Sequence, residues 1–221
     1  MEKNKYYSNS SAMDEAVRTL RTNISFSSVD SKLKSLLITS SSPSEGKSTV
    51  TVNLGRSMAE NGSKVLIIDC DLRHPSIGDV SGNTSMIGLT NYLVDKATIN
   101  DIIIKDHKVD NLHLLLTGPK PPNPAEILGS KKMESLIKSL QDHYDMILVD
   151  TPPVGIITDG AILSTFVGAV IMVVNQGETK AENFKLALKN LENVGAKILG
   201  VVMNKVKMKS GKYGYGYGHY Y

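Results

Sequence analysis

The sequence has too few cysteines to cross-link a core and no apolar run long enough to anchor the chain in a membrane. Cys70 is the single cysteine among 221 residues, which excludes an internal disulfide framework and suits a reducing compartment. Tryptophan is absent, and phenylalanine occurs only three times. The longest clean apolar stretch, 169–174, is far below the roughly 20 residues of a membrane span. The first residues are polar and contain no secretory apolar region, so we expect a cytoplasmic chain that reaches a membrane only through a partner.

An excess of charge is also lacking. The formal net charge of +3 is too small to indicate nucleic-acid binding, and no nucleic-acid partner is expected. Four lysines in residues 205–221, a segment without Asp or Glu, supply the excess. A content of 41% hydrophobic and 21% charged residues excludes a disordered or coiled-coil chain.

Tyrosine is the aromatic residue that the sequence does contain. Seven of the nine tyrosines lie near the chain ends, and five of them are C-terminal: Tyr213, Tyr215, Tyr217, Tyr220 and Tyr221. The first three of these five alternate with glycines. Gly-Tyr alternation cannot pack a core, so residues 205–221 are predicted to be a mobile tail.

Short apolar runs alternate with helical patterns through the middle of the chain. The runs predict strands at 36–39, 64–69, 112–116, 146–149, 169–174 and 198–203, with helices at 48–60, 89–94, 131–143, 159–166 and 181–194. Continuously apolar strands are typical of a parallel sheet covered on both faces. The pattern predicts a doubly wound, mostly parallel α/β domain at 35–204, after an N-terminal segment (1–34) with a helix at 13–26.

The first predicted strand leads through a short loop into a helix. The loop, residues 41–49, matches the Walker A pattern G-x-x-x-x-G-K-[ST] except that Ser41 replaces the first glycine. Loop amides and the helix N-terminus would hold the phosphates of a nucleotide, with Lys47 bridging the β- and γ-phosphates and the Ser48 hydroxyl bound to Mg²⁺. The predicted nucleotide-binding residues are Ser44, Glu45, Gly46, Lys47, Ser48 and Thr49. The alternative is a Ser/Pro loop with a helix-capping serine.

Three aspartates follow apolar strands near this loop. Asp69 and Asp71 end one strand, and Asp150 ends another in the manner of a Walker B strand. Because three carboxylates beside a phosphate repel one another, the arrangement predicts a Mg²⁺ ion among them. Each aspartate taken singly could instead be a helix cap or a turn residue.

Several of these residues together resemble one family. The pattern Asp69-x-Asp71-x-Arg73, the sequence DTPP at 150–153, the run TGPKPPNPAE at 117–126 and the tyrosine-rich end are similar to those of bacterial tyrosine kinases of capsule and exopolysaccharide synthesis. The resemblance implies a P-loop kinase that uses ATP and Mg²⁺ and phosphorylates its own C-terminal tyrosines in trans within a ring, an octamer in the family. It also implies a transmembrane adaptor that activates the kinase and recruits it to the inner face of the membrane, and a cognate tyrosine phosphatase.

The resemblance also implies residue roles. Asp71 would bind Mg²⁺ near the attacking tyrosine hydroxyl, Asp69 would help to organise the metal, and Asp150 would reach its water shell. Arg73 belongs to the same catalytic motif. Asn204, after the last strand, resembles an adenine-contacting asparagine, although a strand can simply end in Asn.

The N-terminal helix also resembles the family, whereas the Walker A loop differs from the family pattern at one position. Glu15, Arg18 and Arg21 resemble the oligomerisation motif of the family, whereas spacing alone favours an intrahelical Glu–Arg pair. Ser44 stands where the family commonly has glycine. If the backbone there requires a positive φ, serine is strained and nucleotide affinity or turnover falls.

Two other functions fit a P-loop domain. A partitioning or cell-division-site ATPase has the same sheet, but it usually has a lysine early in the loop, where this chain has Ser42. A non-catalytic scaffold of the polysaccharide machinery could bind nucleotide through the same loop.

Overall fold

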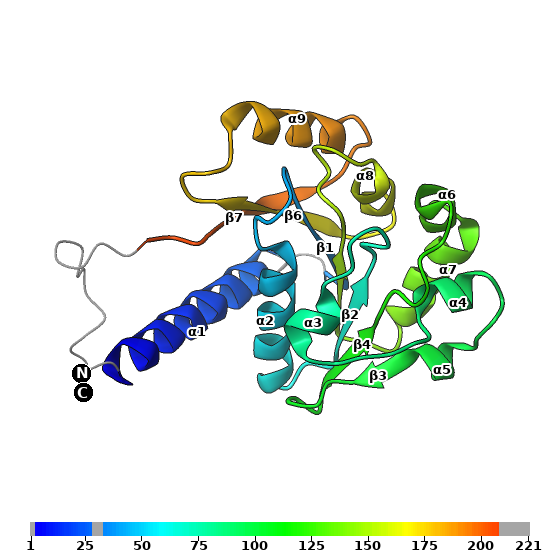
Figure 1. Cartoon of the computed structure of the whole chain (residues 1–221), viewed down its shortest axis with the longest axis horizontal. Coiled ribbons are helices and arrows are strands. Elements are labelled where there is room, and N and C mark those ends of the chain that lie inside the picture. The colour runs from blue at the N-terminus through cyan, green and yellow to red at the C-terminus, as the bar shows by residue number, and fades with distance from the viewer. Residues whose placement is uncertain (1–2, 28–32, 208–221) are drawn as a thin grey trace.

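The computed structural model describes residues 3–27 and 33–207, and the side chains of residues 12–27 and 33–207 (Figure 1). Within these residues seven strands form one sheet: β1 (Ser35–Ser40), β2 (Val65–Asp69), β3 (Ile103–Lys105), β4 (Leu112–Leu115), β5 (Met146–Asp150), β6 (Ala169–Asn175) and β7 (Ile198–Asn204). The helices are α1 (Lys3–Phe26), α2 (Lys47–Glu60), α3 (Ile77–Ser81), α4 (Leu89–Leu93), α5 (Ile99–Ile102), α6 (Pro124–Leu128), α7 (Lys131–Leu140), α8 (Asp159–Ser164) and α9 (Ala181–Glu192).

The strand order determines where the candidate site lies. The strands run β3-β4-β2-β5-β1-β6-β7, and all neighbours are parallel except β3 and β4. The strand β5 separates β1 from β2, with Asp150 paired to both Ile38 and Asp69. The carboxyl ends of β1, β2 and β5 therefore meet at one edge, where α/β sheets bind ligands.

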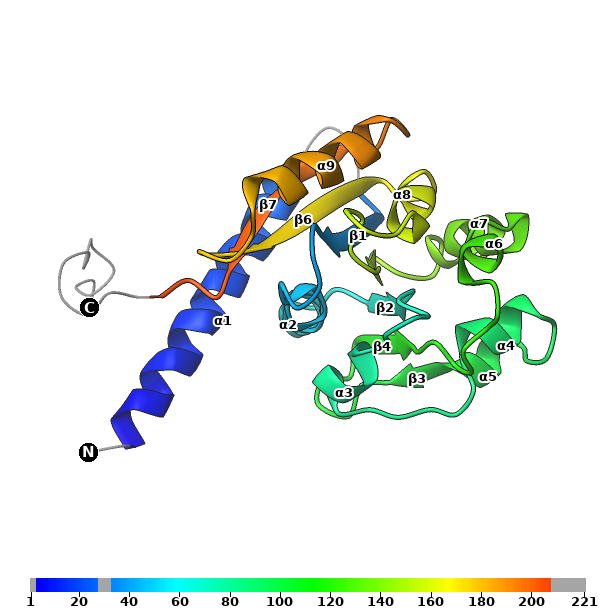
Figure 2. The same ribbon diagram turned by 45° about the horizontal axis from the view of Figure 1, so that its top comes forward.

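Apolar residues cover the sheet on both faces, as the uninterrupted apolar strands predict. One core includes Leu136 of α7, Leu163 of α8 and Leu191 of α9. The other includes Leu54 of α2 and Ile24 of α1. Figure 2 shows α1 and α2 on one side of the sheet and α8 and α9 on the other. The predicted doubly wound, mostly parallel fold is confirmed.

Three short elements and one long helix differ from the prediction. The strand β3 is an antiparallel edge strand of three residues, and α3 and α5 have five and four residues. Elements this short show no periodicity that a sequence pattern can detect. The N-terminal helix begins at Lys3 rather than near residue 13.

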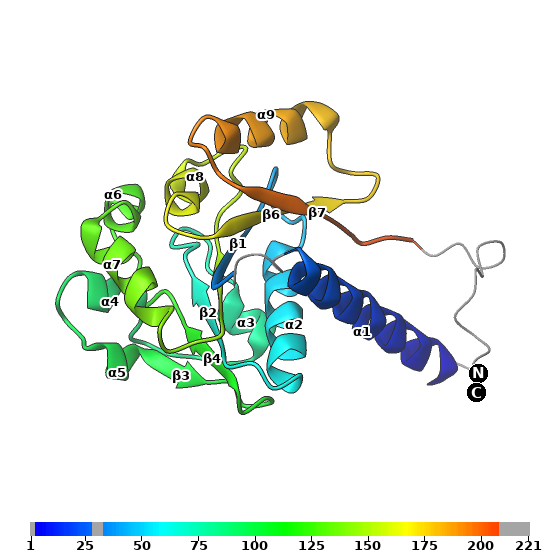
Figure 3. The same ribbon diagram turned by 180° about the vertical axis from the view of Figure 1, so that it is seen from behind.

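The N-terminal helix extends away from the body of the domain (Figures 1 and 3). Its C-terminal part packs on the sheet face through Ile24, which is buried, and Leu20. Nearby, Nη1 of Arg21 donates a 2.8 Å hydrogen bond to the carbonyl oxygen of Ser57 in the last turn of α2, an oxygen that also accepts from the amide of Asn61 at 3.3 Å. Neither α1 nor any other helix in the described part of the chain has the length and apolar character that crossing a bilayer requires.

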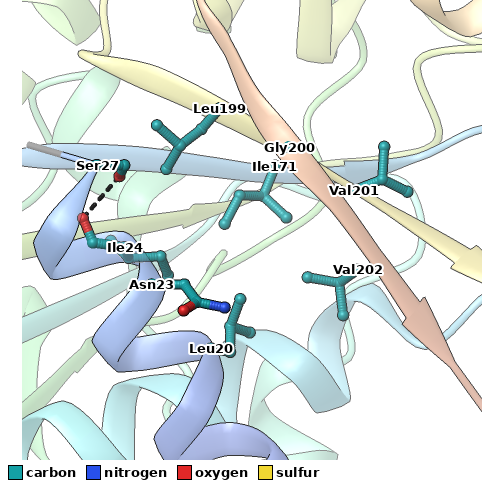
Figure 4. A pocket seen from close by; sticks show the side chains of 9 residues that line it. All are labelled: Leu20, Asn23, Ile24, Ser27, Ile171, Leu199, Gly200, Val201 and Val202. Atoms are coloured by element: carbon teal, nitrogen blue, oxygen red, sulfur yellow. Dashed lines mark hydrogen bonds between the residues drawn. The ribbon is translucent and has the colours of Figure 1, made fainter.

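A groove of about 230 Å³ separates α1 from the edge strand β7 (Figure 4). Gly200 contributes to this space because a Cβ atom added there would meet no atom within 4 Å. The lining residues are Leu20, Asn23, Ile24, Ser27, Ile171, Leu199, Gly200, Val201 and Val202. The helix α1 is thus held by its C-terminal turns and leaves part of β7 uncovered.

Candidate active site

The Walker A segment, residues 41–49, is called the phosphate loop. It joins the end of β1 to the start of α2 and has two residues in left-handed conformations. Gly46 has φ 92°, and a Cβ atom there would lie 2.0 Å from Nδ2 of Asn204, so both the backbone and the space require glycine. Ser44 has φ 62°. The strain expected at Ser44 is therefore present.

Glu45 closes the loop from within. Its side chain is buried, and its carboxylate accepts hydrogen bonds from the amides of Ser41 (2.8 Å) and Ser42 (3.0 Å) and from the hydroxyls of Ser41 and Thr179. Because the carboxylate is fully engaged, a contact from Glu45 to a nucleotide can come only from its backbone. Thr179 lies after β6, so this contact was not visible in the sequence.

The ammonium group of Lys47 lies among acidic side chains. Its Nζ is 3.1 Å from Oδ2 of Asp71, 3.6 Å from Oδ2 of Asp150 and 3.2 Å from Oγ of Ser48. Burial lowers the pKa of Lys47, but Asp150 and Asp71 outweigh burial and hold this pKa above its ordinary value. Lys47 therefore stays charged and neutralises carboxylates that would otherwise repel one another.

Asp150 anchors the first turn of α2 to the end of β5. Its fully buried carboxylate accepts hydrogen bonds from the hydroxyls of Ser48 (2.7 Å) and Thr51 (3.2 Å). Burial raises the pKa of Asp150, while Lys47 opposes the rise. The hydroxyl of Ser76, just before α3, donates to Oγ of Ser48 at 2.6 Å and brings a third segment to the site.

Asp69 and Asp71 have different surroundings although they are two residues apart. The buried carboxylate of Asp69 accepts from the amides of Asp71 and Ile77, both at 3.1 Å, and burial together with Asp150 raises its pKa to about 8. Asp71 accepts from the amide of His74 at 2.9 Å and lines the cavity beside Lys47. Asp69 thus shapes the loop that presents Asp71.

Arg73 turns toward a helix rather than toward the phosphate loop. Its Nε and Nη2 donate to the two carboxylate oxygens of Asp159, at 3.0 and 3.3 Å, in a bidentate pair. Asp159 is fully buried in the first turn of α8. Asp159 was not predicted as a site residue, because an aspartate at a helix start ordinarily indicates no more than a cap.

A cavity of about 740 Å³ lies in front of these residues. Its polar wall comes from the phosphate loop, the first turn of α2 and the β2–α3 loop: Ser44, Gly46, Lys47, Ser48, Thr49, Asp71, His74 and Ser76. An apolar wall contains Val80, Pro152, Pro153, Ile156 and Ile157, and Pro43 and Lys205 complete the lining. The volume suits a nucleotide-sized ligand, since ligand sites usually span roughly 300–1,000 Å³.

The oxygen donors fit a magnesium ion that shares its ligands with phosphates. The Ser48 hydroxyl and the carboxylates of Asp71 and Asp150 converge around Lys47, and hard oxygen donors are what Mg²⁺ prefers. The described residues contain no group of three or more His, Cys, Asp or Glu side chains that could hold a metal ion by themselves. A metal here would depend on phosphate and water oxygens for the rest of its shell.

The remaining predicted site residues do not line the cavity, or they lie outside the residues that the structure describes. Glu15 and Arg18 form an exposed pair at 3.5 Å within α1, while Arg21 binds Ser57 of the same chain. Nδ2 of Asn204 donates to the carbonyl oxygen of Glu45 at 3.0 Å, so the end of β7 lies against the loop. The five C-terminal tyrosines (Tyr213, Tyr215, Tyr217, Tyr220 and Tyr221) lie outside the described residues.

Comparison with known proteins identifies close relatives over most of the chain. A family model described as an AAA domain matches residues 34–199. The putative tyrosine-protein kinase CapB of Staphylococcus aureus is 38% identical over 94% of this chain and 91% of its own length. The tyrosine-protein kinase YwqD of Bacillus subtilis (strain 168) is 40% identical over 91% of this chain and 85% of its own length.

Solved structures of a tyrosine kinase domain and of a cell-division-site protein both resemble this chain. The kinase domain of the Escherichia coli tyrosine kinase ETK superposes with a TM-score of 0.85 and 35% identity, over 92% of this chain and 80% of that one. The septum site-determining protein MinD of Pyrococcus horikoshii OT3, solved with Mg-ADP, gives a TM-score of 0.65 and 28% identity, over 77% of this chain and 69% of that one. The similarity to the kinases is the greater in identity, coverage and superposition.

Proposed function

This chain belongs to the family of bacterial tyrosine-protein kinases, and we propose that it transfers the γ-phosphate of ATP to tyrosine hydroxyls in capsule or exopolysaccharide synthesis. The observation that carries the proposal is the position of Lys47 between Asp71 and Asp150 at the mouth of a phosphate loop. This arrangement supplies a cation for phosphates and a carboxylate for an acceptor within one cavity. Phosphoryl transfer requires positioning and charge neutralisation more than covalent chemistry.

The phosphate loop and the start of α2 would hold the nucleotide. The first amides of α2 lack intrahelical partners and point toward the loop, which suits anionic phosphates. Lys47 would exchange its carboxylate contacts for the β- and γ-phosphate oxygens. The Ser48 hydroxyl, Asp71 and the water-mediated reach of Asp150 would hold Mg²⁺, which when bound neutralises charge on the phosphates. Asn204 would face the adenine end of the site.

Asp71 would orient the acceptor hydroxyl. A tyrosine hydroxyl has an ordinary pKa of about 10, and a loose transition state requires little prior deprotonation. Asp69 is a positioning residue in this proposal, because its carboxylate binds the backbone amides of the segment that carries Asp71. Arg73 is likewise a positioning residue, since its guanidinium binds Asp159.

The acceptors that we propose are the C-terminal tyrosines, reached in trans within a ring of subunits. The exposed Glu15–Arg18 pair on the projecting helix α1 leaves that helix free to meet a neighbouring subunit, while Arg21 would fix its angle through Ser57. A transmembrane adaptor would bring the chain to the inner face of the membrane and activate it, and a tyrosine phosphatase would reverse the reaction. The MinD structure shares the fold. A partitioning-type ATPase usually has a lysine early in the loop, where this chain has Ser42.

The full chain with Mg·ATP tests the proposal, alone and mixed with the cytosolic segment of the capsule adaptor from its own organism. We expect phosphotyrosine in residues 213–221 by mass spectrometry, lost in Lys47→Met and retained in the matched control Lys138→Met, whose lysine forms an exposed pair with Glu134. ATP hydrolysis without phosphotyrosine would identify a partitioning-type ATPase. Nucleotide binding without either activity would identify a scaffold.

A further inference from the structure

We propose that the apolar wall of the cavity, formed by Val80, Pro152, Pro153, Ile156 and Ile157, is the subsite that binds the aromatic ring of the acceptor tyrosine. This inference rests on the proposed kinase function and deepens it. It assigns these residues to acceptor selection, separately from the residues that bind phosphate.

The wall exposes apolar side chains beside strongly polar ones. Ile156 is 64% exposed and Val80 38% exposed, yet both line the same cavity as Lys47 and Asp71. Isolated exposed apolar residues are common on protein surfaces, but these two line one concave site together with the buried Pro152 and Pro153. Covering them with a flat apolar group would remove their surface from water, which favours binding.

The proposal puts the wall beyond the terminal phosphate of a bound nucleotide. Lys205 and Asn204 contact the carbonyls of Ser44 and Glu45 at the β7 end of the loop. Lys47 and Asp71 mark the opposite end, over β2 and β5. Asp150 ends β5 and is the register partner of Asp69 on β2, and Pro152 lies two residues after Asp150. A nucleotide laid along the loop would therefore extend its γ-phosphate toward the side that carries the wall.

The segment after β5, which carries four of the five wall residues, is fixed to the end of β1 and the start of the phosphate loop. The carbonyl oxygen of Pro152 accepts a 2.9 Å hydrogen bond from the hydroxyl of Thr39, and the amide of Val154 donates to the carbonyl oxygen of Ser40 at 2.9 Å. A Cβ atom on Gly155 would lie 2.4 Å from the carbonyl oxygen of Ser41. The amide of Ile156 donates to the carbonyl oxygen of Pro153 in a tight turn. This segment thus has a set position relative to the start of the phosphate loop.

This geometry selects an aromatic acceptor by reach and by contact. A ring packed on the wall would hold its hydroxyl toward Asp71, whereas serine or threonine lacks both the ring and the length. In the transfer, the hydroxyl oxygen bonds to the γ-phosphorus while the bond from that phosphorus to the bridging oxygen of ADP breaks. The hydroxyl proton passes to a carboxylate oxygen of Asp71, and ADP leaves with the electron pair of the broken bond.

The test compares Ile156→Ser and Val80→Ser with Leu186→Ser, a matched control on α9 that is 51% exposed and does not line the cavity. The acceptor is a synthetic Gly-Tyr-Gly-Tyr peptide. Two kinds of measurement are made. One gives KM and kcat for the peptide and KM for ATP. The other gives equilibrium binding, in the presence of Mg-ADP, of this peptide and of its Phe and Ser analogues.

We expect both wall variants to raise the peptide KM about tenfold, the usual effect of losing apolar contact in a substrate pocket, with the KM for ATP unchanged. The wild-type protein should bind the Phe analogue but not the Ser analogue, and Leu186→Ser should behave as wild type. Unchanged peptide KM and binding in both wall variants would overturn the proposal. A loss of ADP affinity without a loss of peptide affinity would overturn it too, because the wall would then bind the adenine base.

The failures of the two proposals can be told apart. If the wild-type protein labels no tyrosine, the kinase function fails, while the peptide-binding measurement still reports on the wall. If labelling occurs and the wall variants match wild type, only the subsite fails.

Discussion

The side chain of Lys205 donates a 2.8 Å hydrogen bond from Nζ to the carbonyl oxygen of Ser44, and both residues have left-handed backbones, with φ 54° and 62°. Non-glycine residues in this region are strained and persist where their surroundings hold them. The pair therefore joins two strained positions, one in the phosphate loop and one directly after the last strand.

The strain at Ser44 predicts the effect of glycine. Ser44→Gly should raise the free energy of unfolding by about 1 kcal/mol, since glycine adopts a left-handed conformation without the steric cost of a Cβ atom. Urea unfolding of the nucleotide-free protein measures this change, with Ser42→Gly as a control for the added flexibility. An unfolding midpoint below that of wild type would show that the serine is not strained.

The cluster around Lys47 predicts non-additive stability. Lys47→Met should destabilise the protein by about 3 kcal/mol, because it leaves two buried carboxylates without a cation. In the Asp150→Asn background the same substitution should cost less, with a coupling of about 1–3 kcal/mol. A double-mutant cycle by chemical denaturation measures the coupling, and strictly additive costs would contradict this account.

The raised pKa of Asp69 predicts a pH dependence. The unfolded chain releases this proton near pH 4, whereas the folded protein retains it up to a pKa of about 8. The folded state binds more protons across this window, so the contribution of Asp69 to stability falls as pH rises from 4 to 8. The free energy of unfolding of Asp69→Asn, measured at several pH values, should fall less steeply than that of wild type. Parallel curves for the two proteins would refute the assignment.

The bidentate pair predicts a structural role for Arg73. Arg73→Leu leaves the buried carboxylate of Asp159 unpaired and should cost about 2–3 kcal/mol. Asp159→Asn in the Arg73→Leu background should recover part of this loss, because the amide carries no charge. Thermal unfolding of the three variants tests the expectation, and a double variant that is less stable than Arg73→Leu alone would contradict it.

The groove beside β7 predicts a stabilising substitution. Gly200→Ala places a methyl group in open space within a strand and should add about 0.4–1 kcal/mol, mainly through the unfolded chain. Gly155→Ala is the opposite case, since its methyl group would lie 2.4 Å from the carbonyl oxygen of Ser41. Urea unfolding should move the two variants in opposite directions. A destabilised Gly200→Ala would mean that the groove closes in solution.

The features predicted correctly are those whose signals are local. The apolar runs at 36–39, 64–69 and 146–149 correspond to β1, β2 and β5, because a strand buried on both faces must be apolar throughout. The loop before Lys47 was recognised from a short contiguous motif, and the positive φ on which the expected strain at Ser44 depended is present. The domain boundaries and the roles of the C-terminal tyrosines stay predictions.

Contacts between distant segments were not predictable. Glu45 binds Thr179, Arg73 binds Asp159 and Arg21 binds Ser57, each pair more than thirty residues apart in the chain. No local pattern records such a partner, because a polar side chain of one type can serve a cap, an ion pair or a ligand.

The sequence by itself determined the doubly wound α/β class, the phosphate loop and the three strand-end aspartates, since hydrophobic periodicity and short motifs are written in consecutive residues. Only the tertiary structure decided which of these groups face the cavity. It turned Asp71 toward Lys47, directed Asp69 and Arg73 to supporting contacts, and brought apolar residues from α3 and from the segment after β5 into the same cavity. The physical reason is that strand order brings distant strand ends together, and packing then determines the direction of each side chain.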